Sequence, residues 1–322
     1  MKLTKNIYRK LAAQGALMVM LLTSCELVVD VDLPEFKPSL VINSVIHPDT
    51  TFTIDLSTNR SILDSNYDFP RVSGATLSLH EDGTLKGTFS ESNDFPGRYT
   101  FDAYPSPGAT YKIVAEKSGL PAAEAQAAIP LEKTVAEIGE TSYRKSEYDG
   151  QIIKLNYTID DPKGEDFYEV KLYVAGYYRE SYYDEEKDTV ILGEEQRYLS
   201  EWYYWTLGAN VNEFEDTNAD YIFDDELFDG QKKRITIEFD NLIYHTPDAD
   251  GNDTSYYTLQ IRRLAKDYYR YLITSNLQYD LGGNGFSEPV QVYSNIKNGY
   301  GIFGAYQTTL LEFALVKGER VK

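Results

Sequence analysis

Apolar and polar residues alternate along much of the chain after residue 39. Phe52, Ile54 and Leu56 occupy alternate positions and therefore share one face of an extended strand. Turn sequences such as Glu81-Asp82-Gly83 interrupt the alternation at steady intervals. Short strands separated by such turns are typical of a β-sandwich, so the pattern predicts one over residues 39–130.

A second β-rich region is predicted over residues 131–322. Two runs of alternating apolar residues flank the turn sequence Asp160-Asp161-Pro162-Lys163-Gly164. The first run is Ile153, Leu155, Tyr157 and Ile159, and the second is Tyr168, Val170, Leu172 and Val174. We expect the two strands to pair as a hairpin of a second sandwich.

The spacing of apolar residues changes near residue 264, where they recur every three or four positions. This spacing places Leu264, Tyr268 and Leu272 on one face and predicts a helix over residues 264–280, ended by Gly282-Gly283. Beyond it, Val290 and Val292 alternate with polar residues, and Asn298-Gly299 is a dipeptide favoured in tight hairpins. We therefore expect a strand near residues 290–294, a second strand beginning at Ile302 and a closing strand over residues 309–316.

The first 24 residues have the features of a signal peptide. Basic residues precede an apolar run that ends in Leu22-Thr23-Ser24-Cys25, and this ending resembles the bacterial lipobox. Cys25 is the only cysteine of the chain, so an internal disulfide is excluded and lipid attachment to Cys25 is the predicted use. Residues 25–38 then form a tether, whose acidic residues after Cys25 loosely resemble a surface-export signal.

Composition narrows the range of partners. The chain carries 51 acidic and 31 basic residues, for a formal net charge of −20 at pH 7. Such a charge repels phosphate backbones, so nucleic acid is not an expected partner. The 28 tyrosines favour strands over helices and agree with a mainly β fold.

Aromatic residues are densest between Tyr177 and Trp205. Neighbouring residues of a strand point to opposite faces, so at most half of Trp202, Tyr203, Tyr204 and Trp205 can be buried in one core. Tyrosine and tryptophan suit a glycan, peptide or protein surface because they join a large apolar face to a hydrogen-bonding group. We expect these four residues to bind a ligand or partner. Cross-strand packing of the rings is the alternative.

Candidate chemistry is sparse elsewhere. Asp216, Asn218 and Asp220 supply oxygen ligands at the spacing that begins a calcium loop, but Tyr221 stands where such a loop needs glycine. Ser287 lacks the final glycine of a nucleophile elbow, and the three histidines form no metal signature. No catalytic residue and no cofactor is therefore expected, with calcium as the exception to test.

Several motifs together resemble one bacterial family. They are Asp267-Tyr268-Tyr269-Arg270-Tyr271-Leu272, Phe286-Ser287-Glu288-Pro289, Val292-Tyr293-Ser294-Asn295-Ile296 and Asn298-Gly299-Tyr300-Gly301-Ile302-Phe303-Gly304. The resemblance is to the Bacteroidota outer-membrane lipoproteins catalogued as domain of unknown function 4249 (DUF4249). It implies a lipid-anchored protein at the outer membrane that is a partner of a TonB-dependent transporter, and it implies no reaction.

The sequence therefore predicts a mainly β protein of two β-sandwich-like domains. The N-terminal one is expected to be prealbumin-like or carboxypeptidase-regulatory-like, and the C-terminal one to carry the single prominent helix. The expected function is a binding or accessory role beside a TonB-dependent transporter in nutrient uptake, facing the cell surface. A stand-alone glycan- or peptide-binding lipoprotein is the first alternative. A glycoside hydrolase using two of the many carboxylates is the second.

Overall fold

The computed structural model describes residues 35–61, 63–65, 68–145, 151–184, 187–201, 205–206, 221–241, 254–281, 288, 290–316 and 319–321. The chain divides into two compact units, Met1–Lys37 and Pro38–Lys322. All elements named below belong to the second unit. Within the described residues, no helix has both the length and the apolar character needed to cross a membrane.

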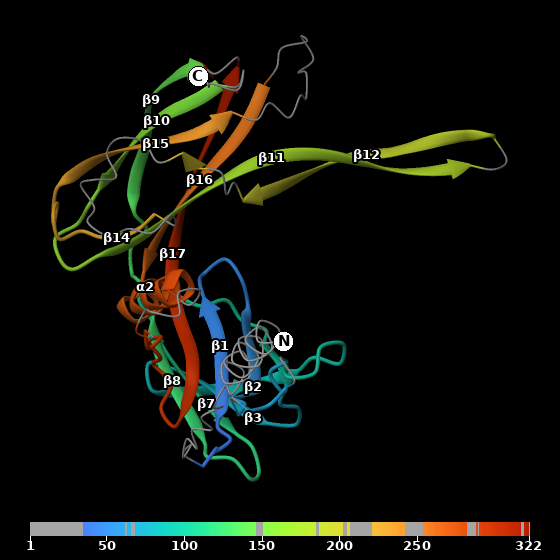
Figure 1. Ribbon diagram of the computed structural model, residues 1–322, viewed down its shortest axis with the longest axis vertical. Coiled ribbons are helices and arrows are strands. Elements are labelled where there is room, and N and C mark those ends of the chain that lie inside the picture. The colour runs from blue at the N-terminus through green and yellow to red at the C-terminus, as the bar shows by residue number, and fades with distance from the viewer. Residues whose placement is uncertain are drawn as a thin grey trace, which may run out of the picture. The chain divides into compact units, whose positions relative to one another are not determined.

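The described strands form three sheets, and the fold is mainly β, as predicted. The largest sheet has the strand order β12-β11-β16-β17-β1-β2-β6-β5, with β14 and β18 pairing at its side (Figure 1). Its strands are β1 Leu40–Ile46, β2 Phe52–Thr58, β5 Ser90–Glu91, β6 Arg98–Phe101, β11 Phe167–Asp184, β12 Thr189–Glu201, β14 Ile222–Asp224, β16 Thr254–Leu264, β17 Gly299–Val316 and β18 Glu319–Val321.

Two smaller sheets complete the sandwich-like arrangement. The first, in the order β4-β3-β7-β8, consists of β3 Thr76–Glu81, β4 Thr84–Thr88, β7 Thr110–Glu116 and β8 Ala123–Ala128. The second, in the order β13-β15-β10-β9, consists of β9 Val135–Lys145, β10 Gln151–Asp160, β13 Trp205–Thr206 and β15 Lys232–Asn241.

Each small sheet shares a hydrophobic core with part of the large one. The first core joins Ile42 and Ile54 of the large sheet to Leu79 and Ile113 of the small sheet. The second joins Leu172 and Leu259 to Leu155 and Ile237 in the same way. Alternation along each strand supplies these inward residues, which explains why the pattern predicted both sandwich-like regions.

The boundary expected between residues 130 and 131 stays a prediction, as does the likeness of the first region to a prealbumin-like fold. The large sheet itself contains strands from both sides of that boundary. It does so because β1 pairs with β17 in parallel, from Leu40 opposite Gly299 to Ile46 opposite Ala305. The strand β17 is 18 residues long and continues as the antiparallel partner of β16.

The single described helix, α2 Lys266–Leu281, confirms the helix expected near residues 264–280. Leu264 and Tyr268 are buried against Ile302 and Tyr306 of β17, while Leu272 is only half-buried at the margin of this cluster. Gly304 makes the close approach possible, because a Cβ atom there would lie 2.6 Å from the Tyr268 ring. The helix therefore packs on the strand that links the two sandwich-like regions.

One predicted hairpin is wrong. The strands β10 and β11 do not pair with each other, since β10 lies between β9 and β15 whereas β11 lies between β12 and β16. The connection at residues 161–166 therefore crosses from one sheet to the other. Alternation identifies strands but does not choose their partners, and this crossing brings together the acidic residues described below.

The strands expected around the Asn298-Gly299 turn also differ. Residues 290–296 form no strand and are held instead by side-chain bonds, such as Tyr293 N to Thr274 Oγ1 at 2.9 Å. The two strands expected after the turn are one continuous β17. Gln307, which interrupts the apolar pattern, is buried and donates to the carbonyl oxygens of Pro130 and Leu131 at 3.0 Å each.

Candidate functional site

Most of the residues that the sequence proposed as sites lie outside the described residues. They are Cys25, Trp202, Tyr203, Tyr204, Asp216, Asn218 and Asp220. Trp205 lies in β13, with its backbone opposite Phe239 of β15. The candidate surfaces that can be built from the structure are a hairpin and a group of buried aspartates.

The hairpin is formed by β11 and β12. The strand β11 pairs with β16 only from Phe167 to Val174, whereas its pairing with β12 runs from Tyr173 to Asp184. Beyond Val174, β11 has no described strand on the side where β16 ended. The outer part of the hairpin is thus a two-stranded ribbon continuing past the end of β16 (Figure 1).

Both faces of this ribbon are exposed. Tyr182 and Tyr183 are adjacent and therefore point to opposite faces, yet their exposed fractions are 60% and 57%. Val190 of β12 is exposed as well, and the Tyr183 hydroxyl donates a hydrogen bond to the Asp188 carboxylate. An isolated two-stranded ribbon is only marginally stable in water, so large exposed side chains on both faces mark a surface suited to a partner.

These tyrosines belong to the aromatic stretch that the sequence singled out, but they precede the four residues proposed there. The pair Tyr182-Tyr183 carries the same signal as Tyr203-Tyr204, namely consecutive rings on a strand. The sequence could not show that β16 stops pairing with β11 before Tyr182 is reached. The residue at which two strands stop pairing is set by tertiary structure.

Three aspartates meet where strands of two sheets end. Asp161 follows β10, Asp166 precedes β11 and Asp225 follows β14. Each contributes one carboxylate oxygen to a group in which all such oxygens lie within 4.8 Å of one another. All three are buried, with exposed fractions of 4%, 6% and 3%. We call this group the aspartate cluster.

Protein donors satisfy part of the aspartate cluster. Asp161 accepts hydrogen bonds from the Tyr168 hydroxyl at 2.5 Å and from Gly230 N at 2.8 Å. Asp166 Oδ1 pairs with Arg263 Nε at 2.5 Å. The Oδ2 atoms of Asp166 and Asp225 are buried and have no hydrogen-bond partner.

The surroundings of Asp161 and Asp225 oppose the ionisation of these two carboxyl groups. Burial raises the pKa of Asp161, and the neighbouring Asp166 and Asp229 carboxylates add to the rise. Burial likewise raises the pKa of Asp225, with Asp161 and Asp166 acting in the same direction. Hydrogen bonds lower both values by less than these effects raise them. The cluster is therefore a concentration of negative charge that its protein neighbours do not fully offset.

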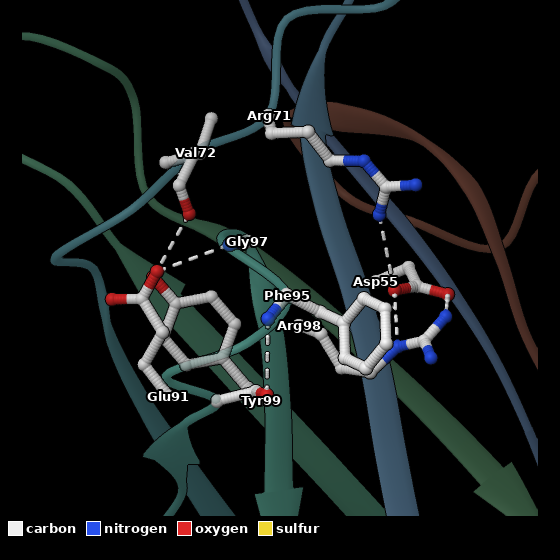
Figure 2. A network of polar contacts seen from close by, with 9 residues as sticks. Asp55, Arg71, Val72, Glu91, Phe95, Gly97, Arg98 and Tyr99 are labelled. Atoms are coloured by element: carbon white, nitrogen blue, oxygen red, sulfur yellow. Dashed lines mark hydrogen bonds and ion pairs between the residues drawn. The ribbon is translucent and has the colours of Figure 1, made fainter.

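Asp55 in the N-terminal sandwich is the opposite case. Figure 2 shows it between the guanidinium groups of Arg71 and Arg98. Arg98 binds both carboxylate oxygens, with Nε 3.0 Å from Oδ1 and Nη2 3.1 Å from Oδ2. The hydrogen bond from Arg98 is the main reason that the pKa of Asp55 is lowered. This carboxylate is satisfied by the protein and offers no site for a ligand cation.

The polar groups of Tyr99 and Glu91 in the same region also have hydrogen-bond partners within the protein. The buried Tyr99 hydroxyl donates to Val72 O at 2.9 Å and accepts from Ala75 N at 3.0 Å. Glu91 accepts a hydrogen bond from Gly97 N at 3.0 Å (Figure 2). It also accepts one from Gly74 N at 2.8 Å. These bonds hold the segment before β3 against β6 and are structural.

The family model for the domain of unknown function DUF4249 matches residues 27–311. The chain belongs to this family. The match includes both sandwich-like regions, the hairpin, α2 and the aspartate cluster, and it confirms the resemblance carried by the motifs around Asp267 and Asn298 at the level of the domain. A comparison with curated proteins finds no match. The description of the DUF4249 family assigns no activity, so function is argued from the sites above.

Proposed function

We propose that this DUF4249 protein is a lipid-anchored outer-membrane binding protein that docks on a TonB-dependent transporter through the β11–β12 hairpin. The observation that carries the proposal is the ribbon beyond Val174, which no described strand covers and which exposes Tyr182 and Tyr183 on opposite faces. The identity of the partner comes from the family resemblance, and the docking surface comes from the structure.

A macromolecular partner suits this ribbon better than a small ligand. Small molecules are held in concave pockets that enclose most of their surface, and a two-stranded ribbon with both faces exposed encloses nothing. A protein partner can instead bury the rings and add a strand to an open edge of the hairpin. This favours transporter docking over the stand-alone glycan-binding alternative.

Neither the aspartate cluster nor Asp55 has the arrangement that the glycoside hydrolase alternative needs. Such enzymes need two carboxyl groups about 5–10 Å apart on either side of an open substrate cleft. The aspartate cluster is tighter than this and buried, and Asp55 is neutralised by two arginines. The proposal is accordingly a binding role without catalysis.

The docking experiment uses the full chain purified from its own membranes in mild detergent. Wild type should co-purify with an integral outer-membrane protein whose uptake activity depends on TonB, identified by mass spectrometry. Tyr182→Ser/Tyr183→Ser should lose at least tenfold in recovered transporter, since interface tyrosines contribute about 1–2 kcal/mol each. Tyr279→Ser, at an 88% exposed position of α2, is the matched control and should recover wild-type amounts.

Two results would contradict the docking proposal. One is equal recovery of the transporter by the double variant and the control. The other is a wild type that recovers no transporter but binds a glycan array through Tyr182, which would favour the stand-alone alternative.

The lipid anchor is tested separately. Cys25→Ser removes the sulfur that would carry the lipid, so the variant should move from the membrane fraction to the soluble fraction. Retention of Cys25→Ser in the membrane after a salt wash would show that another segment anchors the chain.

A further inference from the structure

The aspartate cluster lies at the junction of two sheets. Asp161 and the start of the 161–166 connection continue from β10 of a small sheet, while Asp166 and Asp225 adjoin β11 and β14 of the large one. Backbone bonds join the same segments, from Asp161 N to Gln231 O at 3.2 Å and from Asp225 N to Asp166 O at 3.1 Å. A ligand held here would tie the two layers of the C-terminal sandwich together at one end.

Protein groups match neither the full negative charge of the ionised cluster nor its full hydrogen-bonding capacity. Three ionised carboxylates carry three negative charges, and Arg263, through Asp166, supplies one positive charge. Asp225 is 97% buried and Asp166 94% buried, and the Oδ2 atom of each is buried without a hydrogen-bond partner. Buried carboxylates without partners are costly unless a proton or a cation neutralises them, and a doubly charged cation would match the remaining charge.

The donor set selects the kind of cation. Carboxylate oxygens without any nearby histidine or cysteine in the group favour a hard ion over zinc. Calcium binds oxygens at about 2.3–2.6 Å, so two oxygens that share one ion lie at most about 5 Å apart. The limit of 4.8 Å observed within the cluster meets this condition.

The residues around the cluster also orient one of the proposed ligands and form a cleft beside another. The Tyr168 hydroxyl and Gly230 N fix the orientation of the Asp161 carboxylate, which is the kind of outer support that metal ligands usually have. Asp166 and Arg263 line a surface cleft of about 520 Å³, together with Pro162, Lys163 and Glu165. The cleft therefore borders the cluster at Asp166.

We propose that Asp161, Asp166 and Asp225 bind a calcium ion that clamps the two sheets of the C-terminal sandwich. The remaining ligands are second carboxylate oxygens, backbone carbonyl groups of the adjoining connections or water. This site is distinct from the calcium loop that the sequence predicted at Asp216, Asn218 and Asp220. It uses the Asp160–Gly164 turn and the loop after β14, which are more than 50 residues apart in the sequence.

The test measures calcium directly on the full-length protein in detergent. Calcium is removed with EGTA and dialysis and is then added back. Wild type should bind one calcium ion per chain, and Asp225→Asn should bind one fewer. At calcium concentrations about 100-fold above the dissociation constant, the melting temperature of wild type should rise by about 5–10 °C. The same concentration of magnesium should give a smaller rise, because magnesium demands a tighter octahedral site.

Glu226→Gln is the matched control, because Glu226 is the exposed acidic neighbour of Asp225 in the same loop. It removes the same charge and should keep both the bound ion and the thermal shift. Asp161→Asn is the second variant, and it should lose both. If Asp225→Asn fails to fold, the comparison of Asp161→Asn with Glu226→Gln still decides the assignment.

Two outcomes would overturn the proposal. A wild-type melting temperature that is the same in EGTA and in calcium would mean that a shared proton, not an ion, neutralises the cluster. Equal calcium binding by Asp225→Asn, Asp161→Asn and Glu226→Gln would place the ion elsewhere in this acidic chain. Neither outcome bears on docking through the hairpin, which the transporter experiment tests separately.

Discussion

The two ends of the large sheet are built differently. One end finishes in β5, a strand of only two residues, whereas the other finishes in β12, a strand of 13 residues. Short edge strands are one way in which proteins prevent their sheets from adding strands of other molecules. The β5 end is protected in this way, and the β12 end is not.

Side chains near the two ends follow the same division. Beside β5 and β6, Asp55 is held by two arginines and the Tyr99 hydroxyl uses both its donor and its acceptor capacity. Near the base of β11, Asp166 and Asp225 each keep an unpartnered oxygen. The polar groups of Asp55 and Tyr99 are thus satisfied within the protein, whereas Asp166 and Asp225 each keep a carboxylate oxygen without a partner and the hairpin keeps exposed tyrosine rings.

The largest loss of stability is expected for a substitution at Gly301, in the centre of the sheet. Its φ is +102°, and a Cβ atom there would lie 2.1 Å from Ile42 O of β1. Gly301→Ala should therefore separate β1 from β17 and lower the free energy of unfolding by about 3 kcal/mol or more. Denaturant unfolding measures the effect.

Gly193→Ala in β12 is the control for that variant. A Cβ atom at Gly193 would lie 3.2 Å from Glu180 O, which the uncovered hairpin can accommodate by a small shift. We expect a loss within about 1 kcal/mol. Equal losses for the two variants would remove the contrast between a constrained sheet centre and a tolerant edge.

A smaller effect is expected from Tyr99→Phe. This change leaves Val72 O, which is buried, and Ala75 N, which is partly buried, without their partner and should cost about 1–3 kcal/mol. Tyr183→Phe removes a hydroxyl from an exposed ring and should change stability by less than about 0.5 kcal/mol. Thermal unfolding of both variants in parallel would contradict the comparison if Tyr183→Phe were the more damaging.

A small, pH-dependent effect is expected at Asp55. Because Arg98 lowers the pKa of Asp55 in the folded state, the contribution to stability is present above the unfolded pKa of about 3.9 and is lost as pH falls through the folded value. Asp55→Asn should cost less than about 1 kcal/mol at pH 7, since the pair is partly exposed. Unfolding curves of wild type and variant should converge below about pH 4. A gap that widens there would show that Asp55 acts by another route.

Local pattern was sufficient to predict the strands and the helix because alternation and helical spacing are properties of neighbouring residues. The spacing of Leu264, Tyr268 and Leu272 indicated a helix, and α2 begins at Lys266, directly after that spacing starts. Val290 and Val292 show the limit of that reasoning. Two alternating valines resemble a strand, but residues 290–296 form none, and the segment contacts β8 through the isolated bridge from Lys297 to Glu124 and through the Asn295 side chain.

The sequence could suggest the kinds of candidate site, but not the residues that form them in the structure. The binding role predicted for the aromatic stretch stays a prediction, and the exposure of Tyr182 depends on where β16 stops pairing. Acidic loops suggested calcium, but the aspartate cluster joins residues 161 and 225, whose meeting depends on a crossing between sheets that was predicted as a hairpin. Long-range pairing, not local propensity, creates both features.

The most direct test of the account is a contact measurement at the hairpin in living cells. A photoreactive amino acid at position 182 should form a covalent adduct with an integral outer-membrane transporter, identified by mass spectrometry. The same group at position 279 of α2, which is more exposed than position 182, should form none. Adducts with the transporter from position 279 and not from position 182 would contradict the claim that the uncovered end of the sheet is the docking surface.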